Sequence, residues 1–176
     1  MLKSIKRGIK NRQLILIGED HGTKIIPKTL SKFFINISKN TKFNLIFEIP
    51  KDYKKRRPLG MYSKWYGELI KDMQKRKIKI NLIDFRMSNQ NEFEEKLSKK
   101  ILGLAKSQKC PTIAVLGNVH ASKNIFIWED NSIKTTGYLL SKKLRKKMIS
   151  LRIMKRHKID NFEKKFNRGF DDIIVL

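Results

Sequence analysis

Two histidines of this chain close matching motifs, in which an apolar run is followed by Gly-x-x-His. The stretch "LILIGEDHGT" leads through Gly18 to His21, and the stretch "TIAVLGNVHAS" leads through Gly117 to His120. An imidazole titrates near neutral pH and is a common metal ligand. The repeated motif therefore predicts one site that both histidines face, suited either to acid–base chemistry or to binding a divalent cation.

Polar side chains follow each of the first four apolar runs of the chain. Imidazoles and carboxylates that converge in one place suit a divalent cation, or acid–base chemistry on a carbonyl group. Four residues are candidates both for catalysis and for metal binding: Glu19, His21, Glu48 and His120. Three more are candidates for contacting the substrate or for stabilising a developing oxyanion: Asn118, Arg86 and Asp84.

The pattern of apolar residues predicts how these side chains reach one place. Short, continuous apolar runs alternate with segments whose apolar residues recur at helical spacing, which is typical of a parallel sheet covered by helices on both faces. Such sheets bind ligands at the carboxyl ends of their strands, where the polar candidates stand. The expected strands are 13–17, 44–47, 78–83 and 112–116, and the expected helices are 28–38, 61–76 and 91–105.

The last third of the chain is less regular. Strands are expected at 125–128, 149–154 and 170–176, and a helix is expected over the second half of 135–147. No linker divides the chain, and the only repeat is the Gly-x-x-His motif. We therefore expect one α/β domain over residues 1–176.

Glycine and proline residues near the candidates predict local geometry. Gly18 and Gly117 are expected to supply permissive backbone angles and close approach where each strand turns. Pro50 restricts the residues before it to extended geometry, so it is expected to hold the strand end that carries Glu48 stiffly.

The chain is strongly basic. It has 41 Lys and Arg residues against 16 Asp and Glu residues, a formal net charge of +25. Such a charge attracts nucleic acid, anionic lipid or acidic substrates. The chain is also rich in Lys, Ile and Asn together, as an AT-rich coding sequence produces, and its basic residues are spread out with no nucleic-acid-binding motif among them. An anionic partner and simple solvated basic faces therefore both stay open.

Targeting signals and cysteine usage point to the cytoplasm. No apolar stretch approaches the roughly 20 residues that a membrane span needs. The basic N-terminus is followed by an apolar run too short for a secretory signal. The single cysteine, Cys110, excludes an internal disulfide and fits a reducing compartment. We expect a cytoplasmic protein with no transmembrane segment.

The chain resembles a known superfamily along nearly its whole length. The stretches "LILIGEDHGT", "LIFEIP", "INLIDFR", "AVLGNVHAS", "TTGYLL" and "FDDIIVL" follow its pattern in order. The superfamily joins the erythromycin esterases, the ChaN-like haem-binding proteins and the TIKI/TraB proteins. The resemblance rests mainly on the GE-x-HG and GN-x-H motifs and on the isolated strand-end glutamate, and it is nearest to the Tiki/ChaN-type domains of haem uptake.

This resemblance implies a parallel α/β core with a polar cleft at the strand ends, but it implies no single activity. Erythromycin esterases hydrolyse a lactone with a histidine that activates water, TIKI members are metal-dependent proteases, and ChaN-like members bind haem. Carried over, Glu19 and His21 match the first motif, Glu48 the strand-end glutamate and His120 the second motif.

The chain departs from this family in three features. It lacks the additional helical region of the esterases, and it has no lipoprotein signal or acylation cysteine. The helix expected after the third strand carries neither the Arg nor the Met of many relatives, so one site residue is missing or is replaced by Arg86.

Three functions follow as hypotheses. The first is an esterase or peptidase acting on a small molecule or a peptide. Its four candidate residues either bind a divalent metal of unknown identity or orient and activate water without one, with His21 as the favoured general base. The second is a haem- or metal-binding protein without catalysis, whose iron ligand is a histidine or a tyrosine. The third is a basic binder of nucleic acid or of an anionic surface. The tyrosines open to the second hypothesis are Tyr53, Tyr62, Tyr66 and Tyr138.

Overall fold

A parallel six-stranded sheet forms the centre of the fold. The computed structural model describes residues 5, 8–11, 14–20, 23–49, 64–83, 89–128, 130–156, 164 and 166–176. The strand order is β3-β2-β4-β1-β7-β8, and every neighbouring pair is parallel. These strands are β1 (Leu14–Glu19), β2 (Asn44–Phe47), β3 (Lys79–Leu82), β4 (Thr112–Gly117), β7 (Met148–Met154) and β8 (Asp172–Val175).

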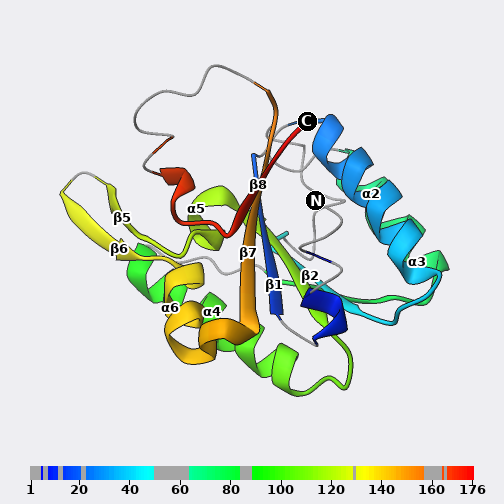
Figure 1. The fold of residues 1–176 in the computed structure, drawn as a ribbon, viewed down its shortest axis with the longest axis horizontal. Coiled ribbons are helices and arrows are strands. Elements are labelled where there is room, and N and C mark those ends of the chain that lie inside the picture. Colours follow the sequence, from blue (N-terminus) through cyan, green and yellow to red (C-terminus); the bar gives the residue numbers. More distant parts are fainter. Residues whose placement is uncertain are drawn as a thin grey trace.

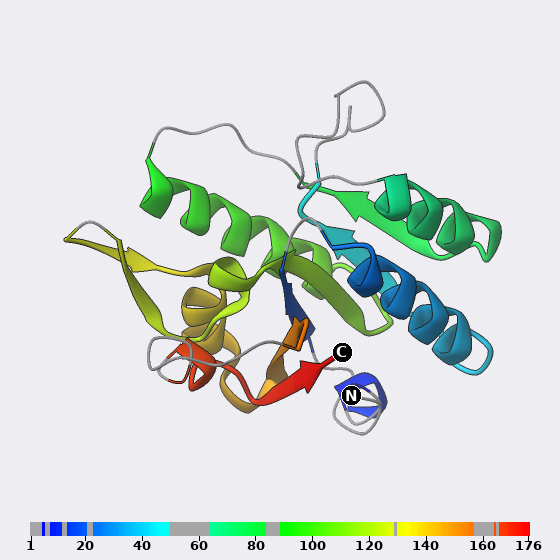
Figure 2. The same cartoon turned by 90° about the horizontal axis from the view of Figure 1, so that it is seen from above.

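Helices cover both faces of this sheet, which confirms the predicted α/β class (Figures 1 and 2). Helices α2 and α3 pack on one face, and α4, α5 and α6 pack on the other. The helical elements are α2 (Ile25–Ser38), α3 (Lys64–Lys75), α4 (Gln90–Lys106), α5 (Asn118–Ala121), α6 (Thr136–Leu144) and the 3-10 turn η1 (Arg145–Lys147). None of the described helices is long and apolar enough to cross a membrane.

The central strands are continuously apolar because both of their faces are buried. Along β1, Ile15 and Ile17 pack toward α2 and α3, whereas Leu14 and Leu16 pack toward α4 and α6. Burying one such side chain contributes about 1.5–3 kcal/mol, so the alternation fixes the strand register strongly. The face of the sheet on which a strand side chain lies therefore determines which helices it contacts.

Five of the six strands begin level with one another, whereas β8 begins beside Leu151, three residues into β7. In sheet order, Lys79 of β3 pairs with Asn44 of β2, which pairs with Thr112 of β4. Thr112 pairs with Leu14 of β1, which pairs with Met148 of β7. One straight row thus forms the amino edge of the sheet, and the opposite edge collects the residues that follow β1, β2 and β4.

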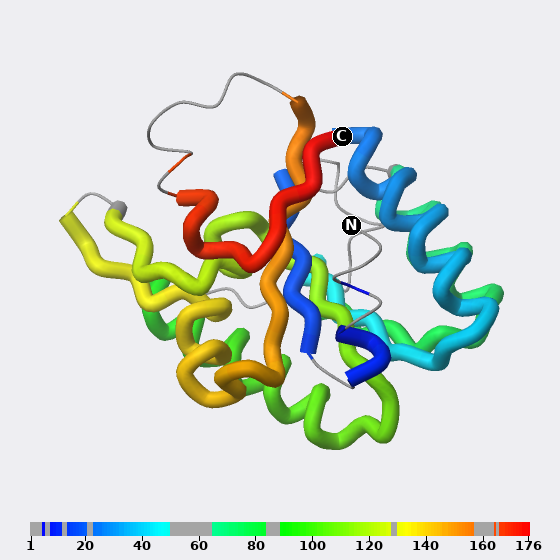
Figure 3. Tube along the Cα trace, in the orientation of Figure 1, coloured from blue at the N-terminus to red at the C-terminus, as the bar shows by residue number. Residues whose placement is uncertain are grey.

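The last third of the chain differs from the prediction in two places. Helix α6 begins at Thr136, so the prediction of a helix only over the second half of 135–147 was wrong. Thr135 explains the early start, because its hydroxyl oxygen accepts a hydrogen bond from the Tyr138 amide at 3.1 Å and caps the helix. A short strand at 131–134 was not predicted; β6 (Asn131–Lys134) pairs antiparallel with β5 (Ile125–Trp128) in a hairpin that projects away from the central sheet (Figure 3).

The two motif glycines differ in what they contribute: Gly117 has ordinary backbone angles, and Gly18 allows a close approach. Gly117 has φ −58° and ψ 149°, an extended conformation open to any residue, so the prediction of permissive angles was wrong there. Gly18 lies inside β1, and an added Cβ would lie 2.9 Å from Asn118 Oδ1 and 3.0 Å from the Ala121 Cβ. Because Gly18 has no Cβ, α5 packs directly on β1, which confirms the predicted close approach. Pro50 lies outside the described residues.

Candidate functional site

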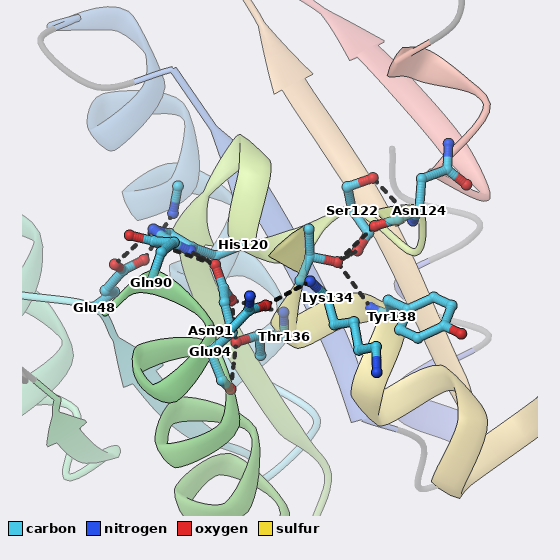
Figure 4. Close-up of polar contacts among 12 residues, drawn as sticks. Glu48, Gln90, Asn91, Glu94, His120, Ser122, Asn124, Lys134, Thr136 and Tyr138 are labelled. Carbon is cyan, nitrogen blue, oxygen red and sulfur yellow. Dashed lines mark hydrogen bonds and ion pairs between the residues drawn. The ribbon is translucent and has the colours of Figure 1, made fainter. Parts of the chain in front are cut away.

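His120 lies between two glutamates at the carboxyl edge of the sheet. Its Nδ1 is 2.5 Å from Glu94 Oε1, and its Nε2 is 3.2 Å from Glu48 Oε1 (Figure 4). The other oxygen of Glu48 accepts a hydrogen bond from the Gly117 amide at 3.0 Å. The Phe93 ring packs against the imidazole, with ring centroids 5.2 Å apart. The structure thus brings together two predicted residues, Glu48 and His120, and adds Glu94.

Glu94 has all of its acceptor positions filled although it is fully buried. Its Oε1 accepts from His120 and, at 3.1 Å, from Gln90 Nε2. Its Oε2 accepts from the Thr136 amide and from the Thr136 hydroxyl, both at 2.7 Å. A buried carboxylate needs such partners to stay charged. The ring orientation of His120 is therefore fixed by a carboxylate whose two oxygens each accept two hydrogen bonds.

Two helix starts position this network. Asn89 caps α4 by accepting a hydrogen bond from the Glu92 amide at 3.2 Å, which sets where the first turn begins. Glu94 then falls three residues before Leu97, on the buried face of α4. From the other side, Thr136 is the first residue of α6, so its amide lacks an intrahelical partner and donates to Glu94 instead. The positive end of α6 also favours the carboxylate.

The charges of the network stabilise a protonated ring. Burial by itself would lower the pKa of His120, but the charge of Glu48 and the hydrogen bond and charge of Glu94 raise this pKa from 6.5 to about 9. Burial by itself would raise the pKa of Glu94, but the hydrogen bond and charge of His120, helped by Thr136 and Gln90, lower this pKa below its ordinary value. At neutral pH, His120 is therefore an imidazolium that donates from both nitrogens.

Gly137 lets α6 come close enough to reach Glu94. An added Cβ would lie 2.3 Å from the carbonyl oxygens of Ala121 and Ser122, so only glycine allows this close packing of α6 against the end of α5.

We expect Gly137→Ala to lower the free energy of unfolding by about 1–3 kcal/mol, because rigid backbone must move to admit the methyl group. Urea unfolding measures this change. The control is Gly103→Ala, where nothing lies within 4 Å and a gain of about 0.5–1 kcal/mol is expected from the better helix former. Equal effects of the two substitutions would contradict the account.

Asn118 belongs to a second polar group on the same face. Its Nδ2 donates to Asp20 Oδ1, and Asp20 also lies 3.8 Å from Nη2 of the buried Arg152. Arg152 donates in turn to Asn167 and stacks over Phe166. The amide donor predicted to stabilise an oxyanion is therefore engaged by Asp20 in this structure.

Glu19 faces the opposite side of the sheet. By strand alternation it follows Ile15 and Ile17 toward α2 and α3, and there it interacts with the buried hydroxyl of Tyr66. Burial, with the charge and the hydrogen bond of Glu19, raises the pKa of Tyr66. The structure therefore separates Glu19 from the Glu48–His120–Glu94 network. The strands that lead to Glu19, Glu48 and His120, which are β1, β2 and β4, nevertheless all end at the same edge of the sheet.

Three of the predicted site residues, His21, Asp84 and Arg86, lie outside the described residues. Within the part of the chain that is described, no group of three or more His, Cys, Asp or Glu side chains is arranged to hold a metal ion. The two candidate metal ligands are Glu48 Oε1 and His120 Nε2, which face each other. Their separation of 3.2 Å also suits neighbouring ligands of one cation, which lie about 3–3.5 Å apart for bonds of about 2.1 Å.

The tyrosines predicted as possible haem ligands are not gathered at this site. Tyr66 is buried against Glu19 and, edge-on, against Phe47. Tyr138 is half-buried on α6 with the Lys142 ammonium 5.3 Å from its ring centroid. The remaining two, Tyr53 and Tyr62, lie outside the described residues.

Glu94 is the member of this network that the sequence did not predict. The sequence predicts a helix over 91–105 from its apolar residues and gives Glu94 no role. A signal was present, because Glu94 stands three residues before Leu97 and seven before Ile101, within the apolar stripe. A carboxylate in such a stripe requires a buried partner.

Comparisons of the chain with family models, curated proteins and solved structures found no match.

Proposed function

We propose that the protein is a hydrolase of ester or peptide bonds in which His120 supplies a positive charge and a proton. The observation that carries the proposal is the placement of the imidazole between Glu48 and Glu94 at the carboxyl edge of the sheet. A carboxylate bound to one ring nitrogen fixes the orientation of the ring and leaves the other nitrogen for chemistry. Here Glu94 holds Nδ1, so Nε2 is the reactive position.

The raised pKa of His120 favours one role over the other. A ring that is protonated up to about pH 9 does not take a proton from water at neutral pH. It suits stabilising the oxyanion that develops on a carbonyl, or protonating the leaving group. Glu48, whose side chain is 14% exposed, lies 3.2 Å from Nε2 and orients its proton. Activation of the attacking water stays with His21, an assignment that rests on the sequence alone.

In an alternative form of the proposal, a divalent metal ion takes the place of the Nε2 proton of His120. Glu48 and His120 would be its ligands, and Glu94 would be the carboxylate behind the histidine that fixes its orientation. When bound, such an ion would polarise a carbonyl or acidify a water molecule. The described residues provide no group of three His, Cys, Asp or Glu side chains at this place, so further metal ligands would have to come from water, the substrate or residues outside the described part.

The test is hydrolysis of a panel of p-nitrophenyl esters and fluorogenic peptides by the wild type and single-histidine variants. We expect His120→Ala to lower kcat by about 10²–10⁴-fold, as removal of a general acid does, and kcat to fall in the wild type as pH rises through about 9. His157→Ala is the matched control and should keep wild-type activity. Full activity of His120→Ala would sink the proposal.

Elemental analysis of the same proteins separates the two forms of the proposal. Stoichiometric metal that is lost in a Glu48→Gln/His120→Ala variant would assign the pair to a cation. Absence of metal together with His120-dependent activity would assign it to the proton. A Soret band on haem titration of an inactive wild type would favour the haem-binding hypothesis over both.

A further inference from the structure

Basic residues surround the amino edge of the sheet. Each helix that runs back toward this edge is joined to the next strand by a short segment that contains lysine or arginine and no acid. These segments are "KNTKF" (39–43), "KRKIK" (75–79), "KSQKCP" (106–111) and "RKK" (145–147). We call the exposed basic residues of these four segments, together with Lys10, the amino-terminal rim.

The rim is continuous because the strands begin on one row. The segments lead into β2, β3, β4 and β7, and Lys10 precedes β1, so five neighbouring strands each begin beside a basic residue. With strands about 4.8 Å apart, the row spans about 19 Å. All the lysine and arginine side chains of the rim are exposed. A composition rich in lysine explains their number, and the four segments that lead into these strands contain no carboxylate.

Two of these cations occupy backbone positions that favour glycine. Lys77 has φ 57° and Arg145 has φ 48°, and each follows the end of a helix. Glycine is the usual residue there, since a side chain is strained at positive φ. Only one other described residue apart from glycines, Asp130, has a positive φ. The rim thus has a lysine and an arginine at two positions where the backbone conformation favours glycine.

A cavity of about 350 Å³ opens at the same edge. Its polar lining comes from Lys10, Asn36, Asn40 and Thr41, which contribute an ammonium group, amides and a hydroxyl. Side chains of these kinds are the ones that contact phosphate and sugar in nucleic-acid complexes.

The rim lacks the apolar side chains with which a protein enters a lipid surface. The large apolar residues exposed in the described part of the chain all lie elsewhere, at the start of α2, on the β5–β6 hairpin and at the end of β8. They are Ile25, Ile125, Ile127 and Val175. A polyanion with a regular row of charges matches the rim better than a membrane does.

We propose that the amino-terminal rim binds the phosphate backbone of a nucleic acid, at the edge of the sheet opposite the His120 network. Contacts of this kind are independent of sequence and displace counterions, so affinity falls steeply as salt rises. The proposal stands apart from the hydrolase proposal, because it uses none of the same residues and its test needs no substrate.

The test measures binding of a labelled DNA duplex and a labelled RNA strand by fluorescence anisotropy over a series of salt concentrations. The rim variant changes one residue in each segment: Lys42→Gln, Arg76→Gln, Lys109→Gln and Lys146→Gln. Each lost phosphate contact reduces the slope of log affinity against log salt by about 0.7–0.9, so the slope should fall by about 3. Affinity at low salt should fall about tenfold or more.

Two controls carry the same change in charge. One neutralises exposed lysines away from the rim: Lys28→Gln, Lys96→Gln, Lys134→Gln and Lys155→Gln. The other neutralises the densest basic cluster in the sequence: Lys54→Gln, Lys55→Gln, Arg56→Gln and Arg57→Gln. Both should keep most of the wild-type affinity and slope.

Three results would overturn the proposal. Equal losses in the rim variant and the first control would show that net charge alone governs binding. A larger loss in the second control would assign binding to residues 54–57. Binding to vesicles of anionic phospholipid but to neither nucleic acid would assign the rim to a membrane surface.

Discussion

Replacing Glu94 by glutamine should lower the free energy of unfolding by about 3–5 kcal/mol. The amide removes the charge that balances His120 and turns a donor toward Thr136, whose amide and hydroxyl both donate to this carboxylate. Breaking one partner of a buried charged pair costs this much because the other charge stays buried. Urea unfolding followed by circular dichroism measures the loss.

The next residue along the helix provides the control. Glu95 is exposed and pairs with exposed Lys99 at 3.4 Å, so Glu95→Gln should change stability by less than about 0.5 kcal/mol. A double-mutant cycle of Glu94→Gln with His120→Gln isolates the pair. We expect a coupling free energy of at least about 1 kcal/mol. Additive single effects would mean that the two residues do not stabilise each other.

Stability should fall as pH rises from 6 to 10, and His120 should account for the largest part of that fall. The pKa of His120 is about 9 in the folded state against 6.5 for the ordinary side chain. A group whose folded pKa is raised contributes stability that is complete below its unfolded pKa and is lost as pH rises through its folded pKa. The shift corresponds to a loss on the order of 3 kcal/mol between about pH 6.5 and 9.

The measurement is the free energy of unfolding of the wild type minus that of His120→Gln, across this pH range. Subtraction removes the titration of groups that both proteins share. The difference should shrink by about 3 kcal/mol as pH rises. Glu94 acts in the opposite direction, because its lowered pKa gives stability that is lost only as pH falls through it. Parallel stability curves from pH 6 to 10 would contradict the assignment of a cation to His120.

Most of the fold could be predicted from periodicity. Continuous apolar runs predicted the strands and helically spaced apolar residues predicted α2, α3 and α4, because burial on both faces of the sheet sets those patterns. The start of α6 was missed since it depends on one capping hydroxyl, that of Thr135, rather than on an apolar stripe. The strand β6 was missed because only Ile133 in it is buried.

The site was predictable only in part, because it depends on which face each side chain takes. Glu48 and His120 were correctly placed together, whereas Glu19 turns to Tyr66 on the other face. The alternation of Ile15 and Ile17 already carries that information, since Glu19 continues the same series. Glu94 comes from a helix rather than from a strand end, so a search limited to strand ends does not reach it.

The full set of donors around Glu94 has a kinetic consequence. Because this carboxylate holds Nδ1 of His120 in the interior, the ring exchanges protons with solvent only through Nε2. The Nδ1 proton and the Thr136 amide proton can leave only when α4, α5 and α6 separate locally. Their hydrogen exchange rates would therefore report how often this face of the protein opens, independently of the titration of the ring.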